Sequence, residues 1–287
     1  MAGSLLLHPD ADETGFANRA GIRIAWRRYG NTPETILFIP TWNFVDSRVM
    51  RRQVDGLRDR FRVLTYDARG SGASDRPSAG YRFEDHLDDA VAVLDATGTA
   101  AASVVAASAG THVAVLLANR YPDRVRSLVL IAPPMDVPSD DRRDSPADGE
   151  PGAPHPDWRT DYPAFVRWFI STAFPEPRWD TTIMEIVEIA LGADHAMLLQ
   201  QGKELDWDVA PRHLEEVCCP TLVIHGTADR TLDVDSVKAV ASSIPGADLA
   251  LLHGLGHRPD ISRPVIVNPI LGDFLGRSPS APLDPGR

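Results

Sequence analysis

The chain has 287 residues, of which 43% are hydrophobic, and its formal net charge is −11. This length suits one large α/β domain, or such a core with an inserted subdomain. The negative charge argues against a nucleic-acid partner, because phosphates require a basic face. No apolar run approaches the roughly 20 residues of a membrane span. Leu5–Leu7 is too short for a signal peptide, so we expect a cytoplasmic protein with no membrane partner.

The first third of the chain alternates between strand and helix patterns. Thr14–Ala17 and Ile22–Tyr29 alternate in polarity around a turn at residues 18–21, which predicts a hairpin. The apolar run Ile36–Ile39, bounded by Pro40, is typical of a strand buried on both faces. The further elements expected here are helices at 47–60, 83–97 and from 110 onward, and strands at 62–66, 101–107 and 125–131.

The same alternation resumes near the carboxyl end. We expect strands at 221–225 and 247–252, each followed by a helix, at 234–243 and 264–275. Strands that alternate with helices of this length imply right-handed crossovers and a mostly parallel sheet.

Between these two parts lies a gap in the alternation, from Pro134 to Arg212. Residues 138–156 are rich in Pro, Asp, Arg and Gly and predict an exposed or partly disordered loop. The rest predicts helices at 162–173, 181–191 and 193–203. Four of the six tryptophans fall in the gap, and we expect one or two of them to face a cleft: Trp158, Trp168, Trp179 and Trp207.

One serine stands where the strand at 101–107 should turn into a helix. The pentapeptide Ala106–Gly110 (AASAG) has small residues on both sides of Ser108. A tight strand–turn–helix raises the serine Oγ above the sheet only if its neighbours let the two backbones pass closely. The same turn directs the N–H of Ala109, at the helix start, toward a developing oxyanion.

A serine nucleophile requires a base, and the base requires an orienting group. The strand at 221–225 continues into Gly226-Thr227-Ala228-Asp229. The strand at 247–252 continues into a glycine-rich loop that ends at His257, followed by Arg258-Pro259. The order Ser108, Asp229, His257 leaves room for one helix and one strand between acid and base. We predict these three residues as a catalytic triad.

The three segments resemble motifs of the α/β-hydrolase family: G-x-S-x-G, with Ala106 in place of the first glycine, then H-G-x-x-D and G-H-x-P. The resemblance covers residues 14–134 and 213–275. It implies a mostly parallel eight-stranded sheet flanked by helices, with an inserted helical cap. The implied organisation is a core in two parts (1–134 and 213–275), a cap (135–212) and a disordered tail (276–287).

The resemblance also places an oxyanion donor after the strand at 36–39. Relatives have His-Gly-x there, with the N–H of x donating, and Trp42 aligns with that donor. Pro40 lacks both the N–H and the imidazole, and Thr41 adopts positive φ far less readily than glycine. We therefore expect a differently built loop, with Trp42 and Ala109 as oxyanion donors and the Thr41 hydroxyl in the pocket. Alternatively, Trp42 simply packs under the cap.

Residues 66–77 resemble the D-x-R-G-x-G-x-S segment of the same family. The segment lacks both glycine spacings that bind phosphates, G-x-x-x-x-G-K-[ST] and G-x-G-x-x-G. We therefore expect it to shape a loop near the site.

Other acids and histidines compete for the triad roles. Asp136 holds an acid position used in some relatives, whereas Asp233 and Asp235 are expected to cap the following helix. His225 and His253 each precede a glycine at a strand end and are interpreted as structural. We expect no metal and no cofactor. The remaining histidines lack ligand spacing and are interpreted as surface or core residues: His8, His86, His112, His155, His195 and His213.

The implied activity is a serine hydrolase acting through an acyl-enzyme on an ester, thioester or lactone of a small apolar molecule. A serine at this turn disfavours the epoxide hydrolases and haloalkane dehalogenases of the fold, in which an aspartate at this position is the nucleophile. The alternatives are a C–C bond hydrolase, a cofactor-free haloperoxidase-like enzyme, an aminopeptidase using Glu185, Glu188 or Asp194, and a non-catalytic ligand-binding relative. The expected partner is a small-molecule substrate, with Trp168 as a pocket candidate. The sequence carries no signal for the oligomeric state.

Overall fold

The computed structural model describes residues 8–136, 156–176 and 181–277. The predicted loop at 138–156 (apart from Pro156), Trp179 and the tail beyond Arg277 lie outside these residues.

Eight strands form one sheet, in the order β1-β2-β4-β3-β5-β6-β7-β8. Only β2 runs antiparallel to its neighbours, and the other pairs are parallel. The mostly parallel eight-stranded sheet is thus confirmed. The strands are β1 (Glu13–Arg19), β2 (Ile22–Tyr29), β3 (Thr35–Ile39), β4 (Arg62–Tyr66), β5 (Ala102–Ala107), β6 (Val125–Ile131), β7 (Thr221–Gly226) and β8 (Asp248–Leu252).

The helices that flank and follow these strands are α1 (Arg51–Leu57), α2 (Phe83–Ala96), α3 (Gly110–Arg120), α4 (Tyr162–Ala173), α5 (Thr181–Leu191), α6 (His195–Glu204), α7 (Val234–Ser243), α8 (Pro259–Ser262) and α9 (Pro264–Leu275). The helix predicted at 47–60 is instead a 3-10 turn at Ser47–Met50 followed by α1. Asp46 caps this turn, and its side chain accepts a hydrogen bond from the Arg48 N–H. The short helix α8 and a 3-10 helix at Pro211–Glu216 were not predicted.

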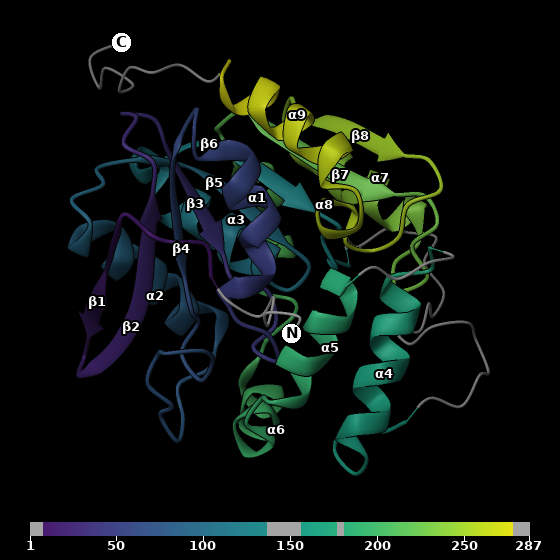
Figure 1. Cartoon of the computed structure of the whole chain (residues 1–287). Coiled ribbons are helices and arrows are strands. Elements are labelled where there is room, and N and C mark those ends of the chain that lie inside the picture. Colours follow the sequence, from purple (N-terminus) through teal and green to yellow (C-terminus); the bar gives the residue numbers. More distant parts are fainter. Residues whose placement is uncertain (1–7, 137–155, 177–180, 278–287) are drawn as a thin grey trace.

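The two faces of the sheet bury different hydrophobic layers. All five residues of β3 are buried, and they alternate between the layers. Ile36 and Phe38 pack in the layer that includes α1 and α9, whereas Leu37 and Ile39 pack in the layer that includes α2, α3 and α7 (Figure 1). Burial on both faces explains why this strand is a continuous apolar run.

The strand order reverses next to β3, since β4 lies on one side of it and β5 on the other. In open parallel sheets, ligands bind beyond the carboxyl ends of the strands at such a switch point. Helices α4, α5 and α6 come between β6 and β7 and form a separate group beside the sheet in Figure 1. Of the predicted cap boundaries, 134/135 falls between β6 and α4, and 212/213 falls inside the 3-10 helix at Pro211–Glu216.

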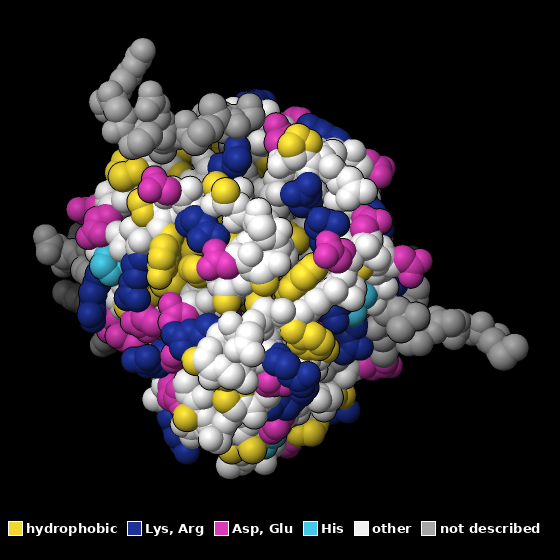
Figure 2. Space-filling view, turned by 90° about the vertical axis from the view of Figure 1, so that its left-hand side faces the viewer, with side chains coloured by type: hydrophobic (Ala, Val, Ile, Leu, Met, Phe, Trp, Pro, Cys, Tyr) yellow, Lys and Arg dark blue, Asp and Glu magenta, His cyan; other side chains and the backbone are white. Residues whose placement is uncertain are grey.

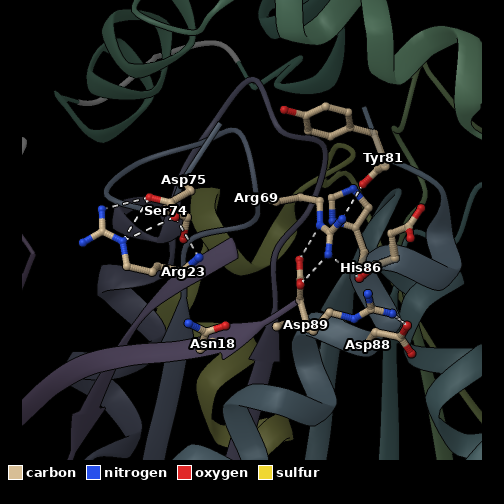
Figure 3. A network of polar contacts seen from close by, with 12 residues as sticks. Asn18, Arg23, Arg69, Ser74, Asp75, Tyr81, His86, Asp88 and Asp89 are labelled. Atoms are coloured by element: carbon tan, nitrogen blue, oxygen red, sulfur yellow. Dashed lines mark hydrogen bonds and ion pairs between the residues drawn. The ribbon is translucent and has the colours of Figure 1, made fainter. Parts of the chain in front are cut away.

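A buried ion pair organises the loop after β4 (Figure 3). The Arg69 guanidinium donates to both carboxylate oxygens of Asp89, at 2.6 and 2.7 Å, and both side chains are almost fully buried. It also donates to the carbonyl oxygens of Gly80 and Asp85. In the same segment, the Ser74 hydroxyl donates to the Asp67 carbonyl oxygen at 2.7 Å. The side chains of the 66–77 segment thus hold the local backbone, as expected.

On the face shown in Figure 2, acidic and basic side chains lie interspersed. Among the described residues, none of the helices has the length and apolar character needed to cross a membrane.

Two histidines, on helices α2 and α3, are buried. His112 of α3 stacks on Phe83, with ring centroids 4.5 Å apart, and Trp207 meets it edge-on. Burial lowers the pKa of His112 to about 4. His86 of α2 is buried beside Gln201 of α6, and burial lowers its pKa to about 3. Both imidazoles are therefore neutral in the folded protein at neutral pH.

These histidines predict a loss of stability in mild acid. Unfolded histidine binds a proton below about pH 6.5, so between that pH and the folded pKa the unfolded state holds more protons. The free energy of unfolding should therefore fall as the pH drops from 6.5 to 5, by about 2 kcal/mol for each histidine. Urea unfolding across this range should show a shallower pH dependence for His112→Asn. The exposed-site control His253→Gln should keep the wild-type slope, and an unchanged slope in His112→Asn would contradict the prediction.

Candidate active site

The backbone at Ser108 turns sharply between β5 and α3. Ser108 has a φ of 50°, in the left-handed region that non-glycine residues seldom adopt. Its N–H donates to the Ile131 carbonyl oxygen at 2.9 Å, which ties the turn to β6. A Cβ on Gly110 would overlap the carbonyl oxygen of Pro40, at the exit of β3. Close backbone packing thus requires a glycine at position 110, two residues after the serine.

His257 links the serine to an acid. Its Nε2 lies 2.9 Å from Ser108 Oγ, and its Nδ1 lies 2.7 Å from Asp229 Oδ2. The imidazole is almost fully buried, and the main-chain N–H of His257 donates to the Ala173 carbonyl oxygen at 2.8 Å. The structure therefore brings together Ser108, His257 and Asp229 from the ends of β5, β8 and β7.

Asp229 is held by hydrogen bonds to its other oxygen. Oδ1 accepts from the N–H and hydroxyl of Thr231, both at 2.7 Å, and from the Leu232 N–H at 3.2 Å. Burial opposes ionisation of this carboxyl. The charge of His257 and these hydrogen bonds outweigh it and hold the pKa of Asp229 below its ordinary value. An ionised Asp229 can accept the Nδ1–H of His257 and leave Nε2 free to take a proton from the serine.

The competing residues occupy other positions. His225 is fully buried, with its Nδ1 3.8 Å from Asp229 Oδ2, and burial lowers its pKa, so the ring is neutral. His253 is exposed. Asp233 caps α7 by accepting from the Ser236 N–H, and Asp235 in its first turn pairs with Lys238. Asp136 is exposed and lines the cavity in front of Ser108.

Ser108 opens onto a cavity of about 460 Å³ between the carboxyl ends of the strands and the helices α4–α6. The predicted pocket residues Thr41 and Trp168 both line it. Its wall is mainly apolar, with eight aromatic residues: Trp42, Phe44, Trp158, Phe165, Trp168, Phe169, Phe174 and Trp207. The expectation that one or two tryptophans of the insertion face a cleft is wrong, because three do: Trp158, Trp168 and Trp207. Their other ring contacts differ, because Trp168 packs on Phe165 within the insertion, whereas Trp207 packs on Phe83 and His112 of the core.

Comparison with known proteins agrees with this geometry. Residues 34–163 match the model of the alpha/beta hydrolase fold. A 2-hydroxymuconate semialdehyde hydrolase from a Pseudomonas species is 30% identical over 224 residues, which cover 77% of this chain and 78% of that protein. The chain belongs to the α/β hydrolase fold family.

Two solved structures show the same fold. A bromoperoxidase from Bacillus anthracis is 25% identical with a TM-score of 0.79, and the match covers 92% of this chain and 100% of that one. The enol-lactonase from Burkholderia xenovorans is similar in fold, with a TM-score of 0.77, 23% identity, and coverage of 92% and 100%.

In this α/β hydrolase, the two candidate oxyanion donors lie beside the serine. Trp42 follows β3, Ala109 precedes α3, and both line the cavity with Ser108. Among the described residues, neither main-chain N–H has a hydrogen-bond acceptor. The Trp42 ring meets Phe44, Trp158, Phe165 and Phe169 edge-on, at centroid distances of 5.2 to 6.2 Å. It therefore both packs under the helices of the insertion and lines the cavity.

Thr231 is a site residue that the sequence interpretation missed. Its Oγ1 lies 2.8 Å from His257 Nδ1 as well as 2.7 Å from Asp229 Oδ1. It therefore supports both partners of the acid–base pair. The available signal was its position two residues after an aspartate, since Asp side chains commonly accept from the main-chain N–H at that spacing.

A group of possible metal ligands is not among the residues that line the cavity in front of Ser108. Donor atoms of His8, Asp46 and Asp67 come within 4.8 Å of one another, although the sequence shows no ligand spacing. Arg48 pairs with Asp46, and Arg27 pairs with Asp67. Burial and Arg27 lower the pKa of His8 to about 4. Because both carboxylates already have a cation, this group is better described as a buried ion-pair cluster.

The packing at Gly110 predicts that this turn tolerates no side chain. Gly110→Ala should force apart the start of α3 and the loop after β3, moving Ala109 relative to Trp42. We expect a destabilisation of about 1–3 kcal/mol and a fall of at least about tenfold in the rate at which a fluorophosphonate labels Ser108. In the control Gly192→Ala, an added Cβ would meet no atom closer than 3.4 Å, and labelling should stay at the wild-type rate. Equal rates in both variants would contradict the prediction.

Proposed function

We propose that this protein is a serine hydrolase that cleaves an ester, thioester or lactone of a small apolar molecule. The observation that carries the proposal is the unbroken hydrogen-bonded chain from Asp229 through His257 to Ser108, at the wall of an aromatic cavity. A serine hydroxyl becomes nucleophilic at neutral pH when a neighbouring base removes its proton.

In the first half-reaction, Ser108 Oγ attacks the substrate carbonyl while His257 Nε2 accepts the hydroxyl proton. The carbonyl oxygen becomes an oxyanion that accepts hydrogen bonds from the N–H groups of Trp42 and Ala109. Asp229 accepts the Nδ1–H and stabilises the imidazolium. The carbon–oxygen or carbon–sulfur bond then breaks, and His257 returns the proton to the leaving group.

In the second half-reaction, water replaces the leaving group. His257 Nε2 takes a proton from this water, and the hydroxide oxygen bonds to the acyl carbon of the ester on Ser108. Collapse of the second tetrahedral intermediate breaks the bond to Oγ. The proton on His257 then returns to Ser108, so the enzyme regains its starting state and the acid product leaves.

The cavity wall supports an apolar substrate. Arg258 is neutralised by two hydrogen bonds to Asp260, at 2.7 and 2.9 Å. Arg159 is 64% exposed and lies over the Trp158 ring. The acids considered for an aminopeptidase, Glu185, Glu188 and Asp194, are not among the residues that line the cavity. The described wall thus lacks an acidic group from these helices to bind a substrate ammonium, and its one carboxylate is that of Asp136, which follows β6.

C–C bond hydrolysis is the second candidate, because the relative that is 30% identical is named as a 2-hydroxymuconate semialdehyde hydrolase. Hydrolysis rates for p-nitrophenyl esters, thioesters, lactones and 2-hydroxymuconate semialdehyde would separate the two. We expect turnover of the apolar esters to be the fastest.

The proposal predicts an activated serine. A fluorophosphonate should label the wild-type protein and leave Ser108→Ala unlabelled, since the probe reacts with a serine whose proton a base removes. A folded wild-type protein that stays unlabelled would favour a non-catalytic ligand-binding role.

The assignment of the base predicts a contrast between two histidines. His257→Ala should lower kcat for p-nitrophenyl esters by roughly 10⁴-fold to 10⁶-fold, because the serine loses its proton acceptor. His253→Ala, which removes the exposed histidine of the same loop, should keep kcat within about twofold, as expected for a surface change. Similar losses in both variants would mean that the base is misassigned.

A further inference from the structure

The loop that carries His257 rests against the end of α4 and the residues that follow it. The His257 N–H donates to the carbonyl oxygen of Ala173, the last residue of α4, at 2.8 Å. A Cβ on Gly256 would overlap the Pro175 ring and lie 2.6 Å from the same carbonyl oxygen. The end of α4 and the loop that carries His257 are therefore in backbone contact immediately beside the imidazole.

Glu176 adds a buried side chain to this contact. Its Oε1 accepts from the Gly256 N–H at 3.3 Å and from the Ser262 hydroxyl at 2.6 Å. The residue is 7% exposed, and its Oε2 is buried without a hydrogen-bond partner among the described residues. A buried polar atom without a partner destabilises the fold, so a carboxyl group kept in this position calls for an explanation.

Helix α4 also faces the cavity. Phe165, Trp168, Phe169 and Thr172 of α4 line the space in front of Ser108, as do Ala173 and Phe174 at its end. A molecule that fills the cavity would press on α4 along one side, while the end of α4 holds the base loop. The position of the His257 imidazole matters, because a displacement of about 1 Å can reduce a reaction rate by about 10²-fold.

We propose that Glu176 is a positioning residue for His257. By holding Gly256 and α8 against the end of α4, it keeps Nε2 within hydrogen-bonding distance of Ser108. This inference rests on the proposed hydrolase function. Glu176 does not line the cavity, so its effect should fall on the reaction rate and leave substrate binding nearly unchanged.

The test compares Glu176→Ala with the conservative variant Glu176→Gln, using p-nitrophenyl ester hydrolysis and the rate of fluorophosphonate labelling. Glu176→Ala should lower kcat and the labelling rate by about 10-fold to 100-fold, with KM within about twofold of wild type. Glu176→Gln keeps an oxygen acceptor in the Oε1 position, and its amide nitrogen takes the place of the unpartnered Oε2. It should therefore recover both rates to within about threefold of wild type, since the bond to Gly256 is retained.

The matched control lies at the other end of the same helix. The Tyr162 hydroxyl donates to the Ala190 carbonyl oxygen at 2.7 Å, in a buried contact within the insertion. Tyr162→Phe removes that hydrogen bond and should lower Tm, while kcat and the labelling rate per folded molecule stay at wild-type values.

Three outcomes would overturn the proposal. The first is a Glu176→Ala protein that reacts at the wild-type rate. The second is a loss in Glu176→Gln as large as that in Glu176→Ala, and the third is a matching loss of rate in Tyr162→Phe. A wild-type protein that fails to react with the probe has a different meaning, because it would remove the hydrolase function itself.

Discussion

The hydroxyl of Ser108 reaches the cavity only because β5 and α3 meet in a turn that forces this residue into a left-handed conformation. Neighbouring groups stabilise this strained turn. The Ile131 carbonyl oxygen of β6 accepts from the Ser108 N–H, and the Pro40 carbonyl packs directly on Gly110. The same contact places the ends of β3 and β5 side by side at the switch point of the sheet. One packing constraint thus positions both the serine and the two candidate oxyanion donors.

The acid and the base reach this point through long-range folding. Asp229 and His257 follow adjacent parallel strands, so the sheet brings their loops to the same edge as Ser108. Burial alone would favour a protonated Asp229, but the imidazole and the donors of Thr231 keep it charged. The buried neutral His225 adds no competing charge. An ionised acid in a dry site is thereby maintained by a few directed hydrogen bonds.

The insertion between β6 and β7 contributes to the site in two ways. Its aromatic rings, with Trp42 and Phe44, form a large part of the cavity wall. The end of α4 and Glu176 contact the loop that carries His257. Residues from the middle of the sequence therefore contact the loop of a base located near its carboxyl end. Helix α4 takes part in both, because Phe165, Trp168 and Phe169 line the cavity and Ala173 at its end accepts the His257 N–H.

Local patterns in the sequence determined the strand and helix alternation, the turn at Ser108, and the acid and histidine at later strand ends, because turn chemistry and hydrophobic period are properties of neighbouring residues. They did not predict α8, the contact of Thr231 with His257, or the role inferred for Glu176. Those depend on which loops the sheet and the insertion bring together, and a single glutamate between two prolines carries no periodic signal. Only tertiary packing decided that three tryptophans of the insertion would face the cavity, since helix pattern alone does not specify the neighbour of each face.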